Sequence, residues 1–426
     1  MISSTYLKFA IILAKWIFWG SIIGIVVGST SALLIAVNDF LTETRFANPF
    51  LVFFLPIGGA VIGYIYLKYG QESDKGNNLI YEHIHHGQGQ LPLKMGPIVF
   101  VSTFITHLFG GSTGREGAAI QMAGSVTELV VKLLKIDHMD RRILLMSAIS
   151  GGFGSAFGAP LAGTIMGMEV AFLGKLKYEA LIPCFTASFV GHLVTSAWGI
   201  EHELQTLKVV PTMTTVVILK VILVSIIFSF ASVLYSQMRH GVEKYSKKFL
   251  KNFVLRAVVG GVIIIALVFI VGSTDYLGRG LPMVNAAFLE PVPPLAFLAK
   301  IVFTAVTMGS GFRGGEVIPL FFIGATLGNT LSPLMGLPMS FLAALGLIAV
   351  FCGGTNIPLT CFIFSIEYFH AQGLTYFFIA CITSYIFSGH HGVWPSQKIY
   401  EPKSRLLDFQ AGETIEAIEK QKNSKE

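Results

Sequence analysis

The chain has 426 residues, of which 53% are hydrophobic and only 13% are charged. Soluble proteins carry roughly 25% charged residues, so this composition, with a mean hydropathy of +0.69, excludes a soluble domain and predicts a polytopic α-helical membrane protein. The net charge of +6 does not indicate a nucleic-acid partner, because the basic residues flank apolar segments.

Long apolar runs alternate with shorter ones along the chain. The runs that approach or exceed the roughly 20 residues of a membrane-spanning helix cover residues 16–37, 50–67, 143–172, 216–234 and 254–271. Shorter runs that Gly, Pro and His separate cover residues 97–109, 320–334, 341–352 and 377–387. We expect the shorter runs to form half-spanning or broken helices. The first run has no signal-peptide cleavage site before it, which favours a retained helix.

Basic residues gather in two places. Six of them lie between residues 239 and 256, and the segment from Lys398 to Lys425 is rich in lysine. Because positively charged loops remain on the cytoplasmic side of a membrane, both segments are predicted to be cytoplasmic.

The chain contains an internal duplication. Arg115 matches Arg313, Pro160 matches Pro358 and Glu169 matches Glu367, all at one offset. Paired Gly/Pro-interrupted segments in two halves of a membrane protein indicate a transport site near mid-membrane. The expected fold is therefore all-α, with two inverted-topology repeats whose broken helices meet at mid-membrane. The expected units are residues 1–207, residues 208–400 and a short cytoplasmic tail, 401–426.

Glycines mark the expected helix breaks, at 76–78, 117–119, 315–317 and 389–392. The N-terminus of a half-helix carries unpaired N–H groups and about half a positive charge, so it attracts anions. These breaks predict anion-binding positions.

Two glutamates lie at such breaks. Glu116 stands between glycines, and Glu316 opens an apolar run. A carboxylate at membrane depth is costly and indicates function. Ionised, Glu116 can occupy the place of an anion at the helix N-terminus, and protonated it can leave, which would exchange a proton for an anion. The structural alternatives are an ion pair with Arg115 for Glu116 and helix-dipole stabilisation, worth about 0.3–1 kcal/mol, for Glu316. Glu169 and Glu367 end apolar helices, and their matched positions favour a structural role.

The run Glu82-His83-Ile84-His85-His86 raises a different hypothesis, an intramembrane metal hydrolase. Its spacing matches no helical metal motif such as His-Glu-x-x-His. Solvated histidines at the membrane interface are the favoured interpretation, and we expect no metal, no cofactor and no enzymatic activity.

The motifs resemble those of the CLC family of anion channels and proton-coupled anion antiporters. Residues 114–118, Gly-Arg-Glu-Gly-Ala, are similar to the gating-glutamate loop of that family, which more usually ends in proline. Residues 158–163, 314–321 and 356–360 are similar to three further family motifs, in the same order. The resemblance implies a homodimer in which each subunit is an inverted repeat with its own pore, and both termini in the cytoplasm.

Three departures resemble one branch of that family, the bacterial fluoride/proton antiporters. Asn77 stands where chloride-handling members have serine, Glu316 where they have an apolar residue, and Val170 where chloride antiporters have an internal proton-transfer glutamate. Two positions depart from the branch as well. Trp394 stands where the family usually has a pore tyrosine, and Ile318 where threonine is expected.

The leading hypothesis is thus a fluoride/proton antiporter of the plasma (inner) membrane, which exports cytoplasmic fluoride in exchange for inward protons. Its expected partners are fluoride, protons, the lipid bilayer and a second copy of the chain. Proton transfer is assigned to Glu116 and Glu316. Anion binding is assigned to Asn77, Asn78, Gly117, Val317, Ile318 and Trp394. The alternative is a chloride/proton antiporter or chloride channel on the same fold.

Overall fold

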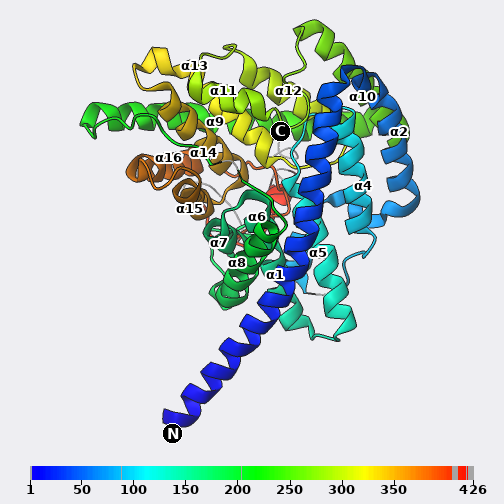
Figure 1. Cartoon of the computed structure of the whole chain (residues 1–426), viewed down its shortest axis with the longest axis vertical. Coiled ribbons are helices and arrows are strands. Elements are labelled where there is room, and N and C mark those ends of the chain that lie inside the picture. Colours follow the sequence, from blue (N-terminus) through cyan, green and yellow to red (C-terminus); the bar gives the residue numbers. More distant parts are fainter. Residues whose placement is uncertain (1, 88, 203, 405–410, 419, 421–426) are drawn as a thin grey trace.

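The computed structural model describes residues 2–87, 89–202, 204–404, 411–418 and 420. Within them the chain forms a bundle of helices, from which the N-terminal end of the first helix extends (Figure 1). The helices of the first half are α1 (Ile2–Ala47), α2 (Leu55–Ile65), α3 (Asn77–His86), α4 (Met95–Leu108), α5 (Glu116–Leu133), α6 (His138–Phe157), α7 (Pro160–Glu169) and α8 (Leu181–Ala197).

The second half repeats this sequence of helices. They are α9 (Thr215–Phe249), α10 (Phe253–Val271), α11 (Leu281–Leu289), α12 (Ala296–Gly309), α13 (Val317–Met335), α14 (Met339–Thr355), α15 (Pro358–Tyr368) and α16 (Leu374–Phe387). Short helical turns occur at Pro49–Phe54, Tyr66–Gly70, Gln71–Lys75 and Tyr178–Ala180. Two short parallel strands, β1 (Phe172–Leu173) and β2 (Lys398–Ile399), join the segment after α7 to the C-terminal region.

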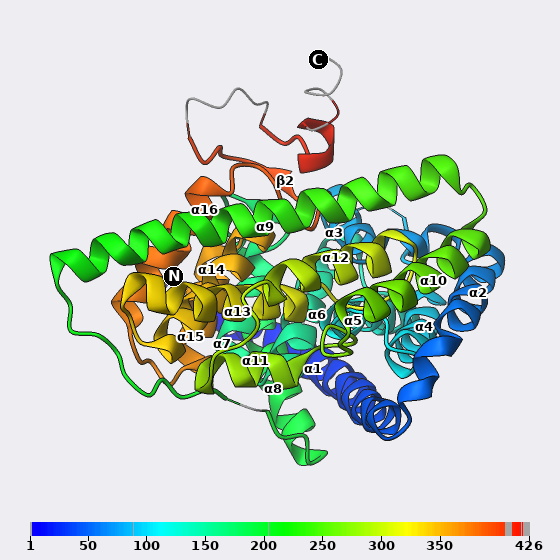
Figure 2. The same ribbon diagram turned by 90° about the horizontal axis from the view of Figure 1, so that it is seen from above.

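The contacts between helices repeat as well. In the first half α1 packs on α6 and α8, and in the second α9 packs on α14 and α16. The halves are joined by contacts of α2 with α10, α5 with α13 and α7 with α15. Viewed from above, α9 crosses one side of the bundle and the C-terminal segment lies outside it (Figure 2). The all-α fold with two inverted repeats is confirmed.

The helices correct the expected spans in three places. The run at residues 143–172 is not one span, because α6 ends at Phe157 and α7 begins at Pro160 after the left-handed Gly158 (φ 66°). The run at 320–334 was expected to be a half-span, but α13 has 19 residues and is apolar enough to cross a membrane. The segment Tyr178–Ala197, which was not among the expected spans, also meets this criterion. The Gly and Pro residues in 320–334 were expected to interrupt the helix, but α13 continues past them, and its Pro333 lies near the C-terminal end.

The single offset of the duplication is wrong for its first block. Helix α4 ends 201 residues before α12 ends, and α5 begins 201 residues before α13 begins. The structural counterpart of Glu116 is therefore Val317. The matching helices α7 and α15 begin 198 residues apart. The difference of three arises between α6, which has 20 residues, and α14, which has 17. The match of Arg115 with Arg313 is therefore not one of equivalent positions.

Glu169 and Glu367 bind each other's helix. The Glu169 carboxylate, at the end of α7, accepts hydrogen bonds from Leu359 N (3.1 Å), Thr360 N (2.8 Å) and Thr360 Oγ1 (2.6 Å) at the start of α15. Glu367 of α15 accepts from Leu161 N and Ala162 N at the start of α7, both at 2.8 Å. Each carboxylate satisfies N–H groups that the first turn of a helix leaves free and compensates the positive end of its dipole. The expected structural role of both glutamates agrees with these contacts.

We predict that Glu169→Ala destabilises the protein more than Glu367→Ala. The first change leaves three donors without an acceptor at a site where Glu169 is only 7% exposed, and a buried unsatisfied donor costs about 1–3 kcal/mol. Glu367 is half-buried and binds two donors, so water can replace it in part. Thermal unfolding of the two variants in detergent measures the difference, and equal losses would contradict this account.

Candidate functional site

The loops that precede α5 and α13 bind each other directly. Gly114 N donates to Gly315 O (2.7 Å), and Gly315 N donates to Gly114 O (2.6 Å). The Thr113 hydroxyl donates to the same Gly315 carbonyl (2.8 Å), and the His107 ring contacts the Gly114 carbonyl through Nε2 (3.1 Å). The N-termini of the two helices therefore meet at one point, where both present free backbone N–H groups.

Glycine is required at this meeting point because the Glu116 side chain lies over it. A Cβ on Gly114 would come within 2.2 Å of Glu116 Oε2, and a Cβ on Gly315 within 2.5 Å. A Cβ on Gly117 would lie 2.7 Å from the Gly314 carbonyl oxygen. The glycines that the sequence places here thus make room for a carboxylate and for close contact of the two loops.

Glu116 is buried, and no salt bridge to it is found among the described residues. It is 2% exposed, and its Oε2 has no hydrogen-bond partner among the described residues. The ion pair with Arg115 that the sequence left open does not form, because Arg115 Nη1 binds Asp39 Oδ1 of α1 (2.7 Å). The same Asp39 oxygen also binds Arg279 (2.5 Å).

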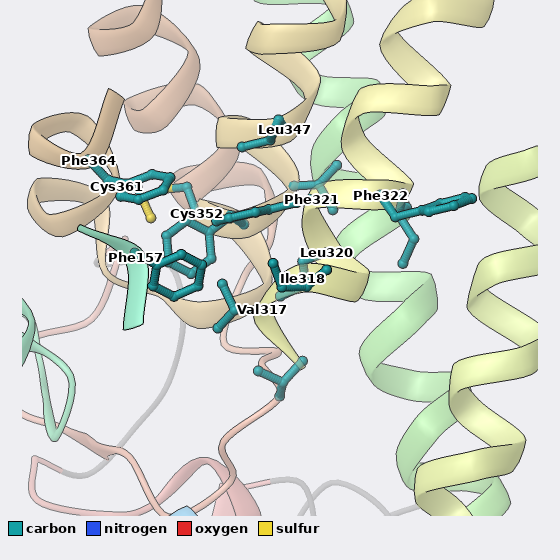
Figure 3. Packing of buried hydrophobic residues seen from close by; sticks show 14 of the residues in the cluster. Phe157, Val317, Ile318, Leu320, Phe321, Phe322, Leu347, Cys352, Cys361 and Phe364 are labelled. Carbon is teal, nitrogen blue, oxygen red and sulfur yellow. The ribbon is translucent and has the colours of Figure 1, made fainter. Parts of the chain in front are cut away.

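Glu116 lines a first cavity of about 600 Å³. The polar part of its wall includes Asp39, Arg115 and Arg279, and its apolar part includes Ile318 and Phe321. Aromatic rings close this wall: Phe321 lies 5.5 Å from Phe157 and 5.4 Å from Phe364, measured between ring centroids. Figure 3 shows these three rings grouped beside Val317 and Ile318.

Glu316 is in a different environment. It directly precedes α13 and is 7% exposed, and its Oε1 lies 2.9 Å from Nε of Arg239, on α9. Arg239 Nη1 in turn binds Glu243 Oε2 (2.7 Å). The sequence did not indicate this pair, since Arg239 was assigned to a cytoplasmic basic segment. It belongs to the 35-residue α9, which extends beyond its apolar part and carries Arg239 back to the site.

A second cavity, of about 550 Å³, lies beside Arg239. Its wall is rich in charge and includes Asn78, Arg239, Glu243, Arg256 and Arg313. Glu116 thus lines one cavity, and the partner of Glu316 lines the other.

The N-terminus of α3 and the segment after α16 meet near the second cavity. Asn77 begins α3, is 9% exposed, and has no partner for its Oδ1 among the described residues. Asn78 Oδ1 accepts from Ser396 N (3.2 Å). The buried Trp394 ring packs edge-on against Tyr81 of α3, with 5.9 Å between ring centroids.

Two tyrosines complete this region and were not found from the sequence. Tyr81 and Tyr235 are both fully buried, and neither hydroxyl has a hydrogen-bond partner among the described residues. Both phenols lie within electrostatic range of Glu316. Tyr81 also contacts Trp394, the residue that stands where the resemblance places a pore tyrosine, so α3 brings a phenol to a position next to it. Isolated tyrosines in apolar helices gave no sequence signal.

Of the other predicted positions, Gly117 lies in the first turn of α5, and Val317 and Ile318 lie in the first turn of α13. They supply backbone N–H groups at the two N-termini. The Ile318 side chain lines the first cavity and has no polar atom to donate.

The histidines of α3 diverge from one another. Glu82 forms an ion pair with Lys75 (2.8 Å), His83 contacts its own helix at Leu79 O, and the His85 ring packs against Phe172. Across the described part of the chain, no three His, Cys, Asp or Glu side chains are placed to hold a metal ion.

Comparison with known proteins identifies relatives that match most of the length of the chain. Residues 58–389 match the family model described as voltage gated chloride channel. A chloride/fluoride channel protein of Pseudomonas syringae pv. tomato is 38% identical over 397 residues, which cover 92% of this chain and 88% of that protein. An H(+)/Cl(-) exchange transporter of Vibrio parahaemolyticus is 23% identical over 275 residues, 60% of this chain and 58% of its own length.

Two solved structures have the same fold. The crystal structure of a CLC-type fluoride/proton antiporter is 31% identical and superposes with a TM-score of 0.88, covering 91% of this chain and 98% of that chain. A slow cyanobacterial Cl-/H+ antiporter, 18% identical, has a TM-score of 0.75 and covers 88% and 94% of the two chains. With its paired loops, its buried glutamates and these relatives, the chain belongs to the voltage-gated chloride channel (CLC) family.

Proposed function

We propose that the protein is a fluoride/proton antiporter that exports cytoplasmic fluoride in exchange for inward protons. One observation carries the proposal: Glu116 and Glu316 are buried beside the two helix N-termini that meet at Gly114 and Gly315. The same small region can therefore bind an anion at the helix N-termini and a proton on a carboxylate. The names of the Pseudomonas relative and of the 31% identical structure support fluoride as the anion, whereas chloride/proton exchangers are more distant relatives.

Glu116 acts as a competitor of the transported anion. Its carboxylate lies across the N-termini of α5 and α13, where backbone N–H groups and the helix dipoles favour a negative charge. When Glu116 takes a proton from the first cavity it loses that attraction, and fluoride replaces it. When fluoride leaves to the first cavity, Glu116 gives up the proton toward the second cavity and returns.

The orientation follows from charge. The second cavity is lined by Arg239, Arg256, Arg313, Lys244 and Lys247, among other residues, and loops rich in Lys and Arg remain in the cytoplasm. The second cavity therefore opens to the cytoplasm and the first to the outside of a plasma membrane. Both termini are cytoplasmic. The chain consists of transport units 1–207 and 208–400, followed by the tail. Residues 405–410, 419 and 421–426 of the tail lie outside the described part. Two copies of the chain form a homodimer.

Selectivity comes from donors that suit a small, strongly hydrated ion. The Asn77 amide offers two N–H donors where a serine would offer one O–H. The hydroxyls of Tyr81 and Tyr235, which have no protein partner among the described residues, add two more. Donors set at the spacing of fluoride are left unpaired by a larger ion, and buried unpaired donors are costly. Ile318 takes part through its backbone N–H, and Trp394 packs against Tyr81.

Purified protein in vesicles should release fluoride at least about tenfold faster than chloride, the factor expected when a mismatched ion loses one hydrogen bond to a buried donor. Asn77→Ser should narrow this ratio, because it removes one donor. Asn78→Ser should change it less, since the Asn78 side chain already binds Ser396. Fluoride- and chloride-selective electrodes measure both fluxes. Equal fluxes of the two halides through the wild-type protein would overturn the fluoride proposal and support the chloride transporter.

Glu116→Gln should abolish proton uptake driven by a fluoride gradient, because glutamine keeps the shape of the protonated side chain and cannot transfer a proton. Glu43→Gln is the matched control, since Glu43 is an exposed carboxylate on the same cavity, and it should transport as the wild type does. A pH-sensitive dye outside fluoride-loaded vesicles reports proton movement. Wild-type proton uptake by Glu116→Gln would remove Glu116 from the mechanism.

A further inference from the structure

Arg239 links the site to the second cavity through a row of alternating charges. Its guanidinium contacts Glu316 through Nε (2.9 Å) and Glu243 through Nη1 (2.7 Å). Glu243 binds Lys247 one turn further along α9 (2.6 Å). Exposure rises along the row, from 7% for the Glu316 side chain to 15% for Arg239, 30% for Glu243 and 52% for Lys247. The row leads from the buried carboxylate to the solvent of the cavity.

Arg239 lowers the free-energy cost of burying the ionised Glu316 carboxylate. A buried carboxylate without a partner is strongly destabilising, and a well-placed guanidinium compensates it. The pairing also has a consequence for the cation. The Nη1 group keeps Glu243 and the His240 ring as partners, whereas Nε contacts the Glu316 carboxylate. Protonation of Glu316 removes the charge that holds this side of the guanidinium.

We infer that Arg239 is the residue that receives fluoride from the second cavity, and that fluoride and the Glu316 carboxylate compete for its Nε–H side. The inference rests on the proposed function. A guanidinium forms strong charge-assisted hydrogen bonds to small anions, and this one stands between the cavity and the Glu316 loop.

The exchange follows from this competition. When Glu316 gains on its carboxylate oxygen a proton that has entered by way of Glu116, the Nε side of Arg239 loses its partner and binds a fluoride ion that enters from the cavity, while Nη1 keeps Glu243. When the O–H bond of Glu316 breaks and the proton leaves to water in the cavity, the carboxylate recovers Arg239. Fluoride is then displaced toward the N-termini of α5 and α13.

Other charged groups near Glu316 do not take this role. Among the residues that the structure describes, the titratable and charged groups that face it are Tyr81 from α3 and Tyr235, Arg239 and Glu243 from α9. Of these only Arg239 is a cation. The other arginines of the second cavity are held elsewhere: Arg313 lies 4.0 Å from the Tyr66 ring centroid and donates to Asp74 O (2.8 Å), and Arg256 lies over Phe253 (4.6 Å).

Arg239→Gln should raise the fluoride KM of transport at least tenfold in vesicles, whereas Arg256→Gln, a change of the same kind on the same cavity, should leave it unchanged. Glu316→Gln should lower the fluoride KM, because it frees Arg239 permanently, and should abolish coupled proton movement. Fluoride flux and proton flux are measured together over a range of fluoride concentrations.

The double variant Arg239→Gln with Glu316→Gln distinguishes fluoride binding by Arg239 from a structural role of Arg239. It removes the Glu316 charge together with its cation, so it can be measured even if the Arg239→Gln variant does not fold. Our inference predicts that its fluoride KM stays elevated. Recovery of the wild-type KM would mean that Arg239 only neutralises Glu316, and would overturn the inference. Neither result affects the proposed function, which is tested by the fluoride and chloride fluxes of the wild-type protein.

Discussion

Two backbone hydrogen bonds between Gly114 and Gly315 fix the arrangement on which the rest of the site depends. They bring the N-termini of α5 and α13 to one point, so the free N–H groups and the positive dipole ends of two helices act on the same small volume. A side chain at either glycine would collide with the Glu116 carboxylate. The same absence of side chains therefore permits the loops to pair and the competing carboxylate to reach the anion's place.

The buried glutamates show how one residue type takes different roles according to its partners. Glu169 and Glu367 end helices and accept hydrogen bonds from backbone N–H groups of the facing helix, which fixes them in place. Glu316 has a cation whose own partners extend to a cavity. Glu116 has an oxygen with no partner among the described residues. The fewer fixed donors a carboxylate has, the lower is the cost of moving it or neutralising it, and the role that we propose for Glu116 needs a carboxylate of this kind.

The two cavities place the two glutamates on different sides of the site. The rings of Phe157, Phe321 and Phe364 close the wall beside the first cavity with side chains that offer no polar group. Glu116 meets solvent on that side, and Glu316 meets it through Arg239 on the other. In the mechanism that we propose, an ion that crosses passes both carboxylates in turn, and their protonation governs its movement.

The amino-acid sequence by itself determined the class of the protein, its inverted repeat and the positions of both site glutamates. These features depend on composition, on glycines and prolines at helix breaks, and on the high cost of a charge in an apolar segment, all of which are local. The motifs at residues 114–118, 158–163, 314–321 and 356–360 also indicated the family. Arg239, Tyr81 and Tyr235 could not be recognised from the sequence, because their positions beside the site depend on helices packed together from distant parts of the chain. It also misjudged the offset between the repeats, since identical residues at Arg115 and Arg313 suggested an equivalence that the three extra residues of α6 abolish. Only the tertiary structure decided which charges are neighbours, because the packing of α3, α9 and α13 sets those distances and sequence separation does not.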